Sequence, residues 1–241
     1  MKKCTYLSLI NQTVLRMKKQ GTKKDKNMQK TLTKIFIVFI LLSCVVGFSL
    51  TSSFFSIFKE VEPGNSVVVD YTLSFEEGAP MISSSKSVVQ KAYQDGYPAA
   101  ITGSMILQAG VLQDEKIIPV NAYVYDGMTQ YALLDLELDA MSTDIIGMHQ
   151  GDVKKINLEF AQNLTENMSS FSFNAIGGNF SEAQVGMLVP LAFNYYADNE
   201  GNSTNTSVQL ERPSVIIEKT NDTIVLRYGY AVADIQITKI Q

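Results

Sequence analysis

The feature that most constrains this chain is an uncharged apolar run at residues 35–58, IFIVFILLSCVVGFSLTSSFFSIF. A helix needs about 20 apolar residues to cross the hydrocarbon core of a bilayer. Ten Lys or Arg and a single acid, Asp25, precede the run, whereas ten basic and 23 acidic residues follow it. Because Lys and Arg collect on the cytoplasmic side of membrane spans, the run predicts a single-pass anchor in the cell membrane. Residues 1–34 would form a basic cytoplasmic tail, and the C-terminal domain would lie outside.

Three other interpretations of the run compete with an anchor. A buried core helix of this length would rarely lack every charge. Lys34 and the apolar residues after it resemble the start of a cleaved signal peptide, and residues 41–44, LLSC, resemble a bacterial lipidation motif. The run continues past both motifs, which favours an uncleaved anchor, but cleavage and lipidation stay open. Met1, Met17 and Met28 are alternative starts, and each keeps basic residues before the run.

The composition of the outer region excludes several classes of function. Both cysteines, Cys4 and Cys44, precede residue 59, so no disulfide framework can hold the outer region and a hydrophobic core must do so. The chain has one histidine, His149, which argues against a histidine-rich metal site and a Ser-His-Asp triad. The excess of acids argues against a nucleic-acid partner. We therefore expect no metal, no cofactor and no nucleic acid.

The clearest strand signal lies at residues 67–75, where Val, Val, Tyr, Leu and Phe alternate with smaller or polar residues. That period of two predicts one buried face. Residues 84–95 follow as a predicted helix that begins at serines and ends at Gly96, with Val88, Val89 and Tyr93 at helical spacing.

The middle of the chain is predicted to alternate between strands and one short helix. Residues 117–131 have β character, with Gly127 as an interruption, and residues 133–148 indicate a strand end followed by a short helix. At the end of that helix, Ile145, Ile146 and Met148 are expected to face inward.

Residues 152–160 are predicted to form the next strand, with Val153, Ile156, Leu158 and Phe160 as its apolar positions.

The last third of the chain is predicted to be mostly β. Residues 163–182 indicate a loop or flap, residues 185–196 a strand and residues 198–207 an exposed loop. Residues 215–219 and 223–228 indicate a hairpin of two strands, and residues 231–240 a closing strand. The outer region is therefore predicted to be an α+β protein, mostly antiparallel β, with one or two short helices.

Two acidic clusters invite a functional interpretation. Glu76 with Glu77, and Asp135 with Glu137 and Asp139, could suggest a cation or glycosidase site. The second cluster alternates with leucines, which is typical of the polar face of a strand. We therefore expect both clusters to be solvated.

Six Asn-X-Ser/Thr triplets occur in the outer region, and all of them lie after residue 160. They begin at Asn163, Asn167, Asn179, Asn202, Asn205 and Asn221. Such triplets are acceptors for N-glycosylation in exported proteins, and together they suit an outward-facing surface.

Four blocks occur in order along residues 60–241: VEPGNSVVVDYT from residue 61, IGMHQGDVKKI from residue 146, VGM from residue 185, and a hairpin with a return strand over 213–240. Their order and spacing resemble FKBP-type peptidyl-prolyl cis-trans isomerases, in particular the SlyD-like branch with an insert in its flap. The resemblance implies an FKBP-like domain at 60–160 and 229–241 and a β-rich insert domain at 161–228.

The resemblance also implies the residues of a proline-binding pocket. Tyr71 matches the tyrosine of the family's first strand, and the aromatic and the acid of the next turn fall on Ile82 and Ser83. One apolar wall falls on Leu138, and Phe160 is the nearest aromatic to the flap tyrosine. Much of the family's aromatic lining is replaced, so the resemblance implies a weakened pocket.

The resulting hypothesis is a membrane-anchored folding factor outside the cell. It would speed isomerisation in extended, proline-containing segments of exported proteins, without a nucleophile or a cofactor. A chaperone or binding domain that uses the insert and lacks isomerase activity is the first alternative. A structural β domain of the cell envelope is the second.

Overall fold

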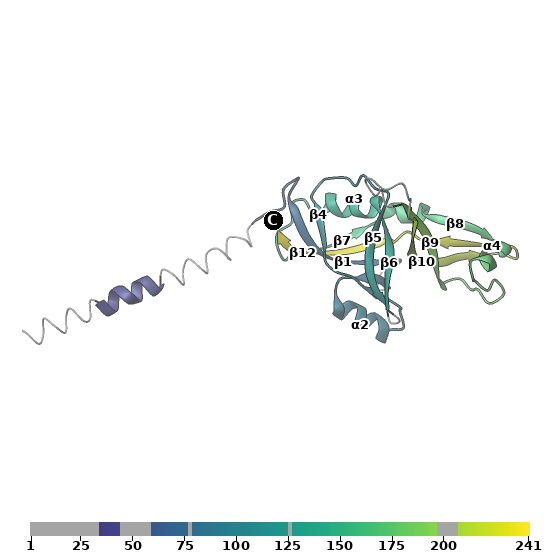
Figure 1. Cartoon of the computed structure of the whole chain (residues 1–241), viewed down its shortest axis with the longest axis horizontal. Coiled ribbons are helices and arrows are strands. Elements are labelled where there is room, and N and C mark those ends of the chain that lie inside the picture. The colour runs from purple at the N-terminus through teal and green to yellow at the C-terminus, as the bar shows by residue number, and fades with distance from the viewer. Residues whose placement is uncertain (1–33, 44–58, 77–78, 125–126, 197–206) are drawn as a thin grey trace, which may run out of the picture. The chain divides into compact units, whose positions relative to one another are not determined.

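The computed structural model describes residues 34–43, 59–76, 79–124, 127–196 and 207–241 (Figure 1). The chain divides into two units, Met1–Ser56 and Ile57–Gln241. In the first unit, residues 34–43 are helical and exposed. The rest of the predicted anchor, 44–58, and most of the basic tail, 1–33, lie outside the described residues. None of the helices in the described ranges is long and apolar enough to cross a bilayer.

The second unit has an α+β architecture, as the sequence predicted. Its strands are β1 (Ser66–Ser74), β2 (Pro80–Ser83), β3 (Ala100–Ile101), β4 (Met105–Gln108), β5 (Ile117–Val124), β6 (Gly127–Leu134), β7 (Val153–Asn157), β8 (Thr165–Ser169), β9 (Leu188–Tyr196), β10 (Ser207–Lys219), β11 (Thr223–Arg227) and β12 (Val232–Ile240). Its helices are α2 (Lys86–Gln94), α3 (Asp135–Asp144), the 3-10 helix η1 (Glu159–Asn163) and α4 (Ser170–Ala175).

The described strands form one mixed sheet that curls into a half-barrel (Figure 1). The order is β7-β12-β1-β2-β3-β5-β6-β10-β11-β8, with β4 beside β1 and β9 beside β10. Most pairs are antiparallel, but β2 with β3 and β6 with β10 are parallel. The single parallel bridge between Tyr131 and Glu211 joins the two halves of the sheet.

Strand β1 is confirmed, together with its two faces. Val67, Val69, Tyr71 and Leu73 are buried, and the residues between them are only half-buried. β1 pairs with β12 along almost its whole length. The predicted hairpin near the C-terminus is confirmed as well, because β10 and β11 pair antiparallel from Val215 opposite Arg227.

The prediction for the acidic cluster at 135–139 was wrong. These residues begin helix α3, and the Glu137 side chain is fully buried. The alternation of leucines and acids matched the period of a strand, but Asp135–Asp144 makes helical hydrogen bonds and directs Glu137 inward.

Two residues expected to face inward are exposed instead. Ile146 follows the end of α3, where the chain turns at Gly147 with φ +83°, and only Ile145 and Met148 reach the core. Val153 lies three residues before Ile156 on β7, and an odd separation puts two side chains on opposite faces of a strand. Ile156 is buried, so Val153 is 69% exposed.

Helix α2 is confirmed, but it packs through a different stripe from the expected one. Val89 and Ala92 are buried, whereas Tyr93 is exposed. The stretch at 163–182, expected to be a loop or flap, instead holds strand β8 and helix α4. The loop predicted at 198–207 falls almost wholly outside the described residues.

The described residues of this unit form two main hydrophobic cores and a third, small cluster of Val89, Ala92 and Ala99. The first core is built on β1, β6, α3 and β12 and includes Tyr71, Ile82, Leu133, Leu138 and Ile235. The second core is smaller and consists of Phe173, Ala183, Leu191, Ile216, Ile224 and Leu226. Every residue of the second core falls within 161–228, yet both cores lie on one continuous sheet. The predicted domain boundaries stay a prediction.

Candidate functional site

The residues transferred from the isomerase resemblance lie in or against the first core. Tyr71 is 2% exposed, and its hydroxyl accepts a hydrogen bond of 3.0 Å from the Thr102 hydroxyl. Ile82 and Leu138 are buried in the first core as well. Burial raises the pKa of Tyr71, although the bond from Thr102 opposes this, so its phenol is neutral at ordinary pH.

The other two transferred residues do not lie in an open site. Ser83 is fully buried, and its hydroxyl lies 2.6 Å from that of Thr72 in a hydrogen bond. Phe160 is half-buried on η1 and packs against the first core. None of the five transferred residues lines either of the two grooves described below, although Tyr71 lines a third, smaller groove of about 180 Å³.

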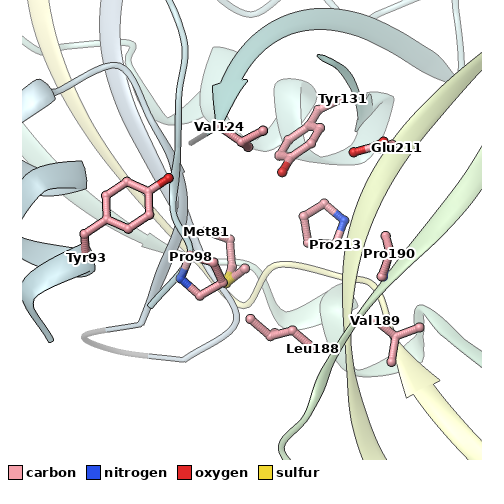
Figure 2. A pocket seen from close by; sticks show the side chains of 10 residues that line it. All are labelled: Met81, Tyr93, Pro98, Val124, Tyr131, Leu188, Val189, Pro190, Glu211 and Pro213. Carbon is pink, nitrogen blue, oxygen red and sulfur yellow. The ribbon is translucent and has the colours of Figure 1, made fainter. Parts of the chain in front are cut away.

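An apolar groove opens instead between α2, the ends of β5 and β6, and the strands β9 and β10 (Figure 2). We call it the first groove. Its volume is about 270 Å³. Its walls are two tyrosines, three prolines, four aliphatic or thioether side chains and one acid: Met81, Tyr93, Pro98, Val124, Tyr131, Leu188, Val189, Pro190, Glu211 and Pro213. Binding sites for organic ligands share this makeup, mostly apolar with a few polar groups.

The pairing of β10 with its neighbours brings the groove residues together. Tyr131 on β6 lies opposite Glu211 on β10, and Pro213 on β10 lies opposite Pro190 on β9. Side chains alternate along a strand. Glu211 and Pro213 therefore line the groove, whereas Arg212 between them points to the opposite face.

The polar groups of the groove are two phenols and one carboxylate. Burial, followed by the charges of Glu211 and Tyr93, raises the pKa of Tyr131 to about 12. Its hydroxyl is therefore a neutral donor at any physiological pH. In Figure 2 the hydroxyl groups of Tyr93 and Tyr131 both point toward the cavity. Glu211 is exposed and forms no ion pair with the residues that the structure describes.

A buried ion pair fixes the strand that carries Glu211 and Pro213. The guanidinium of Arg212 binds both carboxylate oxygens of Glu137, with Nη1 3.1 Å from Oε2 and Nη2 2.5 Å from Oε1. Both side chains are 0% exposed. Arg212 also donates from Nη1 to the Ala132 carbonyl at 2.8 Å and from Nε to the Tyr228 carbonyl at 2.7 Å.

The Glu137 carboxylate of this pair accepts a further hydrogen bond, and an aromatic ring lies against the Arg212 guanidinium. Oε2 of Glu137 accepts from the backbone N–H of Leu134 at 3.0 Å, which closes the first turn of α3. The Arg212 guanidinium lies 4.5 Å from the centroid of the Tyr230 ring. Burial lowers the pKa of Arg212, but Glu137 and the nearby tyrosines raise it by more. Arginine suits this place because its planar fork matches a carboxylate.

A second groove lies beside the second core. Its volume is about 250 Å³, and its lining includes Phe173, Ile176 and Met187. It shares Leu188, Val189 and Pro190 with the first groove. The two grooves therefore adjoin along the start of β9.

Sequence reasoning missed both the groove and the ion pair. One signal was present: Arg212 occurs two residues after Leu210 and four before Ile216, at the phase of the buried face of β10. An arginine in that position needs a buried carboxylate. Nothing local to Glu137 marked it as that partner.

The described ranges contain no cluster of three or more His, Cys, Asp or Glu that could hold a metal ion. Neither a family model nor a curated protein matches the chain.

Proposed function

We propose that residues 59–241 form a folding factor that binds extended, proline-containing polypeptide segments in the first groove. There it speeds rotation about their X-Pro bonds. The observation that carries the proposal is the groove itself, with its tyrosines, prolines and aliphatic side chains around a cavity of about 270 Å³. A proline ring is apolar and fits such a lining, and the two phenols can donate to peptide carbonyls.

The chemistry needs no nucleophile and no cofactor. Rotation about an X-Pro bond is slow because the amide has partial double-bond character, which is lost as the bond twists. Transfer of the amide out of water disfavours its planar, polar form relative to the twisted one. Any contact that is stronger in the twisted state lowers the barrier further. The neutral hydroxyl of Tyr131 is the group that we assign to this contact.

Two features of the sequence support the same proposal. The four blocks that resemble SlyD-like FKBP isomerases suggest this activity and this substrate class. The apolar run at 35–58 and the charges around it favour a position at the cell membrane, with the domain outside and exported chains as clients.

The proposal is tested by substituting two tyrosines that have nearly the same exposed fraction. Tyr93 lines the groove and is 41% exposed, whereas Tyr97 is 40% exposed and is not a lining residue. With the full chain in detergent, Tyr93→Ala should weaken binding of a fluorescent apolar X-Pro peptide by roughly fivefold, as expected for the loss of about 1 kcal/mol of aromatic contact. Tyr97→Ala should bind as the native chain does. Equal effects of the two substitutions would rule out the groove.

Catalysis is tested in the same preparation by the rate of cis-trans exchange in a short X-Pro peptide. We expect acceleration over buffer, with a large part of it lost in Tyr131→Phe. A rate equal to that in buffer would exclude the isomerase part of the proposal and leave the binding part.

A second candidate function is a chaperone that holds apolar segments without rotating them. The second groove favours it, because Ile176 and Met187 are exposed there and the groove adjoins the first one. Suppression of the aggregation of an unfolded protein, without acceleration of the peptide exchange, would support this candidate over the isomerase.

A further inference from the structure

The edge of the sheet at β8 is open. β8 stands last in the strand order and pairs only with β11 among the described strands. An edge strand presents unpaired N–H and C=O groups to which another chain can add, and native proteins protect such edges. β8 has the sequence TENMS, in which Glu166 is the one charged residue and no lysine or proline discourages pairing.

Three glycosylation triplets surround this edge. Asn163 is the last residue of η1, two residues before β8 begins, and Asn167 is the middle residue of β8. Asn221 lies in the turn between β10 and β11. That turn contacts the far end of β8, where the N–H of Ser170 donates to the Asp222 carbonyl at 2.8 Å. Acceptor asparagines therefore stand at both ends and in the middle of one strand.

The side chain of Asn167 is oriented for modification. Met168 packs on the second core, and adjacent side chains of a strand point to opposite faces. Asn167 therefore faces solvent, and its amide makes no hydrogen bond to any residue in the described ranges. Asn163 and Asn221 are exposed as well.

Asn179 provides a contrast within the same molecule. Its triplet is intact, but its Oδ1 accepts from the hydroxyl of Ser181 at 2.7 Å and from the N–H of Ser181 at 3.2 Å. It also lines the second groove rather than the β8 edge. Asn202 and Asn205 lie outside the described residues.

We propose that Asn163, Asn167 and Asn221 carry N-linked glycans and that these glycans shield the open edge of β8. The co-substrate is an oligosaccharide linked to a lipid diphosphate, transferred by a separate enzyme. The amide nitrogen of asparagine bonds to the anomeric carbon of the sugar and loses a proton. The bond between that carbon and the diphosphate oxygen breaks, and the lipid diphosphate leaves.

The proposal rests on the outward location of the domain but not on the grooves. Sugar transfer of this kind requires the domain to meet the donor outside the cytoplasm. Peptide binding in the first groove is measured separately and does not depend on the glycans, so failure of one proposal leaves the other intact.

The first experiment is mass spectrometry of peptides from the full chain, purified from the membrane of the organism that makes it. We expect sugar-bearing peptides that include Asn163, Asn167 and Asn221. The peptide with Asn121, an exposed strand asparagine without a triplet, should be bare. Recovery of all three acceptor peptides solely in unmodified form would overturn the proposal.

The second experiment tests the shielding. The triple variant Asn163→Gln, Asn167→Gln, Asn221→Gln should self-associate more than the native chain in sedimentation velocity. Asn179→Gln should not. A second triple variant, Thr165→Ala, Ser169→Thr, Thr223→Ala, removes two triplets and keeps the one at Asn167, and it should fall between these two. A glycosylated native chain whose first triple variant sediments unchanged would overturn the shielding role.

Discussion

The two main cores of the domain differ several-fold in the number of apolar side chains that they bury. Among the described residues the first core buries 25 apolar side chains and the second only six. Large apolar side chains remain exposed close to the second, including Ile176 and Met187 in its groove. Apolar surface that folding leaves uncovered is available to bind other chains. Under the proposed function, the first core mainly stabilises the domain, and the two grooves beside the second core and at the boundary between the cores bind clients.

The boundary between the two cores, where β6 pairs with β10, offers the most severe test of this comparison. The Glu137–Arg212 pair links α3 and β6 of the first core to β10, which also carries Ile216 of the second core. Removal of one member leaves a buried charge without its partner. We expect Glu137→Ala or Arg212→Ala to lower the free energy of unfolding by about 3–5 kcal/mol, measured by urea denaturation.

Two controls separate the charge effect from the loss of packing. The double variant Glu137→Leu, Arg212→Met replaces the pair by apolar groups and should be much more stable than either single variant. The exposed pair Glu76–Arg227, at 3.5 Å with Glu76 77% exposed, should cost less than about 1 kcal/mol when Glu76 becomes Ala. Similar losses at Glu137 and Glu76 would mean that the boundary is not held by the buried pair.

A substitution at Gly229 tests the boundary between the two cores by displacing the backbone there. It stands between Tyr228, which packs on the second core, and Tyr230, which is buried in the first. A Cβ at Gly229 would lie 2.6 Å from the carbonyl oxygen of Ala161, so the backbone must move. We expect Gly229→Ala to cost about 1–3 kcal/mol of stability and to weaken peptide binding.

Gly103 is the matched control for that substitution, because a Cβ there meets nothing within 4 Å. Gly103→Ala should leave the urea midpoint unchanged or raise it slightly. An unchanged urea midpoint for Gly229→Ala would show that η1, which carries Ala161, can move away from Gly229. The boundary between the cores would then not be fixed at this point.

Tyr131 connects the first core to the groove, and its titration is a third test. Its pKa is about 10 in the unfolded chain and is raised to about 12 in the folded one, by burial first. The folded state therefore favours the protonated phenol. That stabilisation is complete below pH 10 and is lost as the pH rises toward 12. At about 1.4 kcal/mol for each pH unit, the loss is on the order of 2 kcal/mol.

Tyr131→Phe should remove that part of the alkaline destabilisation. The measurement is the free energy of unfolding in urea at pH 9 and at pH 11 for both proteins. Buried Tyr71 and Tyr230 also have raised pKa values because of burial, so the native slope will exceed the difference due to Tyr131. Identical slopes for the native and variant chains would mean that Tyr131 is solvated and that the groove is open to water.

The sequence predicted the first core better than the boundary. The alternation at 67–75 fixes the buried face of β1, because the pattern and the partner β12 agree over the whole strand. Glu137 shows where this reasoning ends. Its alternation with leucines has the period of a strand, and its partner lies 75 residues away. Local periodicity carries no information about such a pairing.

The first groove could not be predicted from the sequence for the same reason. Its lining runs from Met81 to Pro213, and these residues meet because β10 pairs with β6 and β9 and Arg212 binds Glu137. The site residues taken from the isomerase resemblance stay a prediction. Tyr71, Ile82 and Leu138 lie in the first core and Phe160 packs against it, and none of the transferred residues lines either of the two apolar grooves.

The smallest effect concerns the single acid of the first groove. Glu211 is an exposed carboxylate among apolar residues, and it makes no ion pair within the described ranges. A client segment with a lysine next to its apolar residues would supply the missing cation. We expect such a peptide to bind the native chain up to about fivefold more tightly than its glutamine counterpart, in keeping with about 0.2–1 kcal/mol for an exposed pair.

Glu211→Gln should erase this preference while binding of the glutamine peptide stays constant, and added salt should erase it in the native chain. Glu218→Gln is the control, since Glu218 is exposed on the same strand and does not line the groove. A preference for lysine that survives in Glu211→Gln would mean that the long-range negative charge of the outer region attracts the peptide. In that case the first groove would select its clients by apolar contact alone.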